Sequence, residues 1–80
     1  MTDDEARDRL FSIIRSVLDD ETLALSMATT AQDVPGWDSL KQIMIIVEIE
    51  ERLGVRLSSR EIDAAQCVGD LVALVVRKTV

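Results

Sequence analysis

The sequence predicts an all-α fold: a small four-helix bundle of three main helices and one short helix, with a long loop between the first and second helices. Three observations predict it. Apolar residues recur at three- and four-residue spacings, capping residues precede several of these segments, and 80 residues suit one domain, 1–80, with a compact core.

The first helix is predicted over residues 4–18, because its apolar residues fall on one helical face. Acidic residues at 3–5 stand near the positive end of its dipole. From Asp19 to Trp37 the periodicity fades, and this long loop contains a Pro35-Gly36 turn near its end. The apolar face of the first helix consists of Leu10, Ile13, Ile14, Val17 and Leu18.

The second main helix is predicted over residues 39–53. Its run IMIIVEI is rich in β-branched residues, which leaves a buried strand as the alternative. Fifteen residues are too many for a typical strand. Asp38 is suited to cap the start, and Gly54 to end the helix in a left-handed conformation.

The remaining two helices follow from capping signals and charge. Ser58 and Glu61 have the spacing of a capping box, which predicts a short helix reaching about Ala65. The final helix is predicted over residues 69–78, with a strand as the alternative because of its valines. Its basic last residues, 77 and 78, suit a helix C-terminus.

The second main helix carries two apolar stripes when its residues are projected at about 100° each. One stripe suits the core and contains Ile45, Ile46, Ile49 and Leu53. The other contains Leu40, Ile43, Met44 and Val47, with Glu50 and Glu51 beside it. This second stripe is either buried in a central helix or partly exposed as a docking surface for a partner with a groove and basic residues.

Composition excludes several classes of function. The net charge of −6 repels nucleic acid, and no apolar run approaches the ~20 residues of a membrane helix. The acidic N-terminus is unlike a secretory signal, so we expect a cytoplasmic protein. With one cysteine, Cys67, and no histidine, the chain lacks the ligands of a structural zinc site. We expect no metal site, no nucleic acid or membrane partner, and a monomer.

Ser39 follows the Pro35-Gly36 turn in the stretch PGWDSLKQI. A catalytic serine needs an adjacent base, and the chain has no histidine. Asp38-Ser39 suits a helix cap with no further function, but a helix N-terminus also favours a phosphate. Ser39 is therefore well placed to carry a phosphate-linked group that another enzyme installs.

These residues resemble the acyl carrier protein family. The resemblance runs through DSL at 38–40, IMIIVEIEERLGV, SSREI and CVGDLVALV, and so covers nearly the whole chain in order. VPGWDSL looks most like stand-alone carriers of specialised polyketide-type pathways.

The resemblance implies a non-catalytic carrier. Ser39 would receive 4'-phosphopantetheine from coenzyme A through a phosphopantetheinyl transferase, and the arm would hold acyl groups as thioesters. Asp38 and Leu40 match the residues that help the transferase recognise the serine. The implied partners also include acyl-loading and acyl-processing enzymes with basic docking patches. Their docking residues would be Ile43, Met44, Val47, Glu50 and Glu51.

The chain departs from the family pattern at three positions. Lys41 and Met44 stand where fatty-acid carriers commonly have acidic residues, which makes a general fatty-acid role doubtful. Cys67 replaces a frequent Thr or Ser before the last helix and implies a weaker cap and a partly buried thiol. Two alternatives remain for the function: an aminoacyl or peptidyl carrier of the same fold, and an unmodified helical adaptor.

Overall fold

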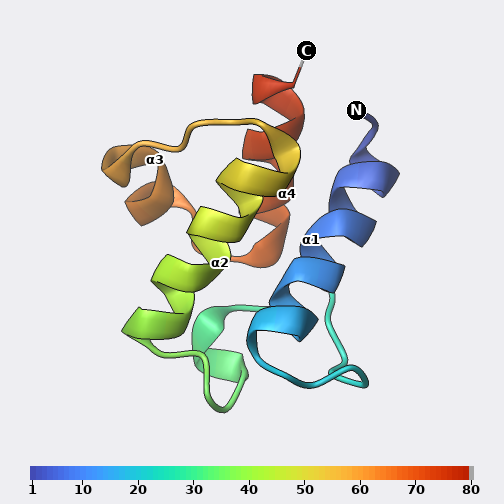
Figure 1. Cartoon of the computed structure of the whole chain (residues 1–80), viewed down its shortest axis with the longest axis vertical. Helices are drawn as coiled ribbons and strands as arrows, with labels where there is room; N and C mark the ends of the chain where they lie inside the picture. Colours follow the sequence, from blue (N-terminus) through green and yellow to red (C-terminus); the bar gives the residue numbers. More distant parts are fainter. Residues whose placement is uncertain (80) are drawn as a thin grey trace.

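The computed structural model describes residues 1–79 and confirms the all-α prediction (Figure 1). It contains no strand in that range, so both strand alternatives were wrong. The first helix begins and ends one residue earlier than predicted, the short helix ends one residue before Ala65, and the last helix begins one residue earlier. The second main helix has the predicted bounds. The elements are α1 (Asp3–Val17), the 3-10 helix η1 (Ala31–Asp33), α2 (Ser39–Leu53), α3 (Ser59–Ala64) and α4 (Val68–Lys78).

The core lies where α1 packs against both α2 and α4 (Figure 1). The apolar face predicted for the first helix supplies Leu10, Ile13 and Ile14, all of them buried. One stripe of α2 contributes Ile45, Ile46 and Ile49. The amphipathic α4 contributes five buried residues, Val68, Leu71, Val72, Leu74 and Val75. Burial of this apolar surface is the main source of the bundle's stability.

Local capping signals fix the ends of three helices. Thr2 caps α1 by accepting a hydrogen bond from the Glu5 N–H. At the end of α2, Gly54 takes the left-handed conformation with φ 66°, as predicted. Ser58 and Glu61 form the predicted capping box at the start of α3.

The start of α4 is held by the long loop rather than by a side chain. Its N-cap residue, Cys67, makes no side-chain capping bond. Instead, the Val68 and Gly69 N–H groups donate to the carbonyls of Thr29 and Met27, each at 2.8 Å. The loop therefore satisfies two N–H groups that a helix start otherwise leaves unpaired.

The short helix α3 is tied to the last turn of α4 by an ion pair. The Lys78 ammonium lies 2.8 Å from Glu61 Oε1. This bond, with the capping bonds from Ser58, lowers the pKa of Glu61 to about 2. None of the described helices is long and apolar enough to cross a membrane.

We predict that Gly69→Ala destabilises the protein. A Cβ at this position would lie 2.8 Å from the Met27 carbonyl oxygen, so the loop or the helix must move. We expect urea unfolding, followed by circular dichroism, to show a loss of about 1–3 kcal/mol. Ala73→Gly is the control for this comparison. It exchanges the same two residue types at an exposed position of the same helix, so it reports the effect of helix propensity alone. A gain in stability for Gly69→Ala would show that the close approach does not matter.

We predict a pH-dependent role for the Lys78–Glu61 pair. Because the pKa of Glu61 is lowered in the folded state, the pair stabilises the fold above about pH 4.5, and this contribution is lost as the pH falls toward 2. Lys78→Gln should therefore lower the urea midpoint at pH 6 and have little effect near pH 2. Arg77→Gln removes the same charge without breaking an ion pair to Glu61. An equal pH profile for the two variants would contradict the prediction.

Candidate functional site

Ser39 is the first residue of α2, and its side chain is exposed. The preceding turn contains Gly36 with φ 87°, a conformation that favours glycine. Val34, 6% exposed, anchors the loop just before this turn. The hydroxyl is therefore presented to solvent at a fixed helix start, where the helix dipole favours negative charge.

Asp38 is the N-cap of α2. Its Oδ1 accepts a hydrogen bond from the Lys41 N–H at 2.9 Å. This bond confirms the predicted cap and gives the carboxylate a structural role beside Ser39.

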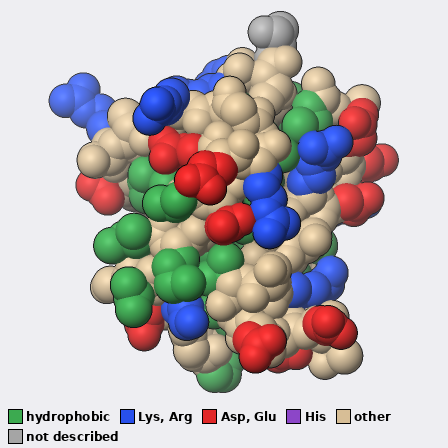
Figure 2. Space-filling view, viewed as in Figure 1, with side chains coloured by type: hydrophobic (Ala, Val, Ile, Leu, Met, Phe, Trp, Pro, Cys, Tyr) green, Lys and Arg blue, Asp and Glu red, His purple; other side chains and the backbone are tan. Residues whose placement is uncertain are grey.

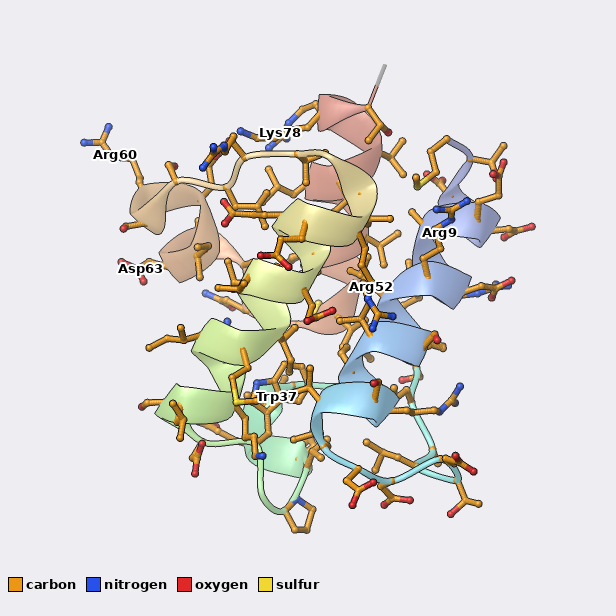
Figure 3. The ribbon with its side chains drawn as sticks, viewed as in Figure 1. Arg9, Trp37, Arg52, Arg60, Asp63 and Lys78 are labelled. Atoms are coloured by element: carbon orange, nitrogen blue, oxygen red, sulfur yellow. The ribbon has the colours of Figure 1, made fainter. Side chains whose placement is uncertain are left out.

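Trp37 packs next to the start of α2 rather than standing free. Its indole Nε1–H donates to Gln42 Oε1 at 2.7 Å, and its ring lies against the core while remaining partly exposed. Figure 3 shows Trp37 near the lower end of α2. Gln42 was not predictable as a partner of Trp37, because a spacing of five residues across a turn gives no recognisable signal in the sequence. The bond links the turn to the helix that carries Ser39.

The second apolar stripe of α2 is exposed to solvent. In Figure 2, hydrophobic side chains gather over the half of α2 that follows Ser39. The exposed fractions are 63% for Leu40, 60% for Ile43, 40% for Met44 and 42% for Val47. Of the two explanations that the sequence left open, exposure is therefore the correct one. A contiguous set of large exposed apolar side chains is typical of an interaction surface.

The charged residues around this stripe are mostly engaged within the chain. Arg52 pairs with Glu48 at 2.7 Å. The half-buried Glu50 accepts the Leu57 N–H at 2.9 Å, so it holds the segment that follows α2. Glu51 is exposed. The structure thus gives the two predicted docking acids different environments.

Cys67 lies beside Trp37 and Gln42 along a hollow of about 90 Å³. It is half-buried, in agreement with the expected partly buried thiol. Across residues 1–79, no group of three or more His, Cys, Asp or Glu side chains is arranged to hold a metal ion.

Comparison with known proteins gives two positive findings. A family model described as "Phosphopantetheine attachment site" matches residues 8–75. The solution NMR structure of a holo acyl carrier protein from Geobacter metallireducens is similar to this chain with a TM-score of 0.86 and 36% sequence identity. The match covers 91% of this chain and 84% of that one. No curated protein matches the sequence.

We predict that Asp38→Ala lowers the free energy of unfolding by about 1 kcal/mol, because the cap bond to Lys41 is lost. Urea unfolding followed by circular dichroism measures this change. Asp38→Asn keeps an acceptor oxygen but removes the charge, and we expect it to unfold close to wild type. Equal losses for the two variants would show that charge, rather than the cap bond, is responsible.

Proposed function

The chain belongs to the family of domains with a phosphopantetheine attachment site, and we propose that Ser39 is its attachment residue. The protein is an acyl carrier, which tethers acyl groups on covalently attached 4'-phosphopantetheine. The observation that carries the assignment is the exposed Ser39 hydroxyl at the capped start of α2.

The residues around Ser39 fit a phosphate-linked group. The unpaired N–H groups and the dipole of a helix start favour a phosphodiester. Lys41 adds a positive charge within the same turn. The Asp38 carboxylate accepts the Lys41 N–H and keeps its negative charge, so the fit to a phosphate rests on the helix start and on Lys41.

The attachment chemistry requires only a nucleophilic oxygen from this chain. The Ser39 hydroxyl oxygen forms the new bond to the phosphorus nearer the pantetheine of coenzyme A. The bond between the two phosphates of coenzyme A breaks, and adenosine 3',5'-bisphosphate leaves. A phosphopantetheinyl transferase with a divalent metal supplies the base that takes the serine proton. We propose that the chain itself catalyses no reaction, because it has no histidine and Asp38 is used as a cap.

The family fold implies partners that include the transferase and biosynthetic enzymes. We propose that acyl-loading and acyl-processing enzymes dock on α2 through Ile43, Met44 and Val47. Among the acids, Glu51 is available to a basic group on the partner, whereas Glu50 is held by Leu57. We also propose that residues 1–80 act as a single domain and as a monomer. Asp38 and Leu40, which flank Ser39, would help the transferase recognise it.

We predict that the purified protein gains the mass of one phosphopantetheine when it is incubated with coenzyme A, Mg²⁺ and a broad-specificity phosphopantetheinyl transferase. Intact-protein mass spectrometry measures the gain. Ser39→Ala should gain nothing, while Ser59→Ala, at another exposed helix start, should be modified like wild type. An unmodified wild type, or a modified Ser39→Ala, would refute the assignment.

A further inference from the structure

A groove between α3 and α4 lies outside the site described above. It has a volume of about 350 Å³. Small side chains form part of its wall, at Ala64, Ala65 and Ala73, and two arginines, Arg60 and Arg77, also line it. Both arginines are exposed, and within residues 1–79 no ion pair joins either one to a carboxylate. Two guanidinium groups are therefore available to a ligand at this groove.

Positive charge gathers at one end of the groove. Arg60 and Arg77 are the sequence neighbours of Glu61 and Lys78, which pair with each other at 2.8 Å. Asp70, the other acid that lines the groove, lies two helical turns before Arg77, about 10 Å away along α4. In Figure 2, basic side chains gather along the upper edge of the molecule, over α3 and the end of α4. This end of the groove therefore suits carboxylates, which arginine binds in a bidentate manner.

The charge of the sequence divides in the same way. Residues 1–53 contain twelve acidic and five basic residues, a net charge of −7, whereas residues 54–80 contain three acidic and four basic residues, a net charge of +1. The fifteen residues of α2 span about 20 Å, and Ser39 at its start lies at the opposite end of the bundle from the end of α4 (Figure 1). An acidic partner is therefore repelled by the half that carries Ser39 and attracted to the α3–α4 end.

We propose that the groove between α3 and α4 is a second docking site, which binds an acidic segment of a partner protein. Arg60 and Arg77 bind carboxylates of the segment, and the alanines allow its backbone to approach closely. A partner bound there leaves the start of α2 uncovered, so one protein holds the chain while an enzyme acts at Ser39. This last consequence rests on the proposed attachment at Ser39, whereas the docking site itself does not.

The test uses the full isotope-labelled chain and an acetylated peptide of two glutamates followed by four alanines. The control peptide has lysines in place of the glutamates. We expect the glutamate peptide, at low salt, to shift the backbone amide signals of residues 60–77 in nuclear magnetic resonance spectra and to leave those of residues 38–44 unchanged. The lysine peptide should not shift the groove signals, and added salt should weaken binding of the glutamate peptide.

Two double variants separate the groove from the overall charge of the protein. Arg60→Gln with Arg77→Gln should raise the Kd of the glutamate peptide at least about tenfold, because both carboxylate contacts are lost. Arg7→Gln with Arg9→Gln removes the same charge from α1, and we expect its Kd to stay within about twofold of wild type. The same titration, followed through the amide signals, measures all three values.

Several outcomes would overturn the proposal. Equal Kd values for the two double variants, or shifts spread over the whole surface, would exclude the groove as a specific site. Displacement of the peptide by an equal concentration of inorganic phosphate would make it a site for small anions. Slower modification of Ser39 by the transferase when the peptide is bound would show that the two ends are not independent. Failure to modify the wild type without peptide would instead refute the assignment of Ser39 and leave the docking site unaffected.

Discussion

The position of Ser39 depends on two backbone hydrogen bonds between the long loop and the first turn of α4. The carbonyls of Met27 and Thr29 accept the N–H groups of Gly69 and Val68, and the absence of a Cβ at Gly69 permits this approach. Since α4 packs on α1 and contributes buried residues to the core, the loop is fixed to the core of the bundle. The chain then has only a short path through η1 and the glycine turn to the serine (Figure 1).

Helix bounds were predictable where the signals are local. The bounds of α2 were predicted to the residue because Asp38 and Gly54 act through their own backbone neighbourhood. The start of α4 shows the opposite case. Cys67 correctly indicated that α4 lacks a strong side-chain cap. The N–H groups at this helix start are instead bonded to backbone carbonyls about forty positions earlier in the chain. Such a tertiary partner leaves no pattern near the helix that it caps.

The sequence predicts the residues of the candidate site but does not indicate their environments. Helical periodicity identified the second stripe of α2, yet its exposure depends on how many helices surround α2, which only the packing decides. Glu50 and Glu51 are adjacent acids in the sequence, and the structure distinguishes them because Leu57 lies within reach of Glu50 alone. Met44 also lines a groove together with Val17 of α1, and a groove that two helices share has no signal in any single segment of the sequence.

Trp37 has a consequence for the observation of this protein in action. It is the chain's one tryptophan, it lies two residues before Ser39, and its indole is bonded to Gln42 while remaining partly exposed. Indole fluorescence responds to changes in solvation and hydrogen bonding. The protein therefore carries an intrinsic optical probe at the start of α2, two residues from the serine that we propose as the attachment residue.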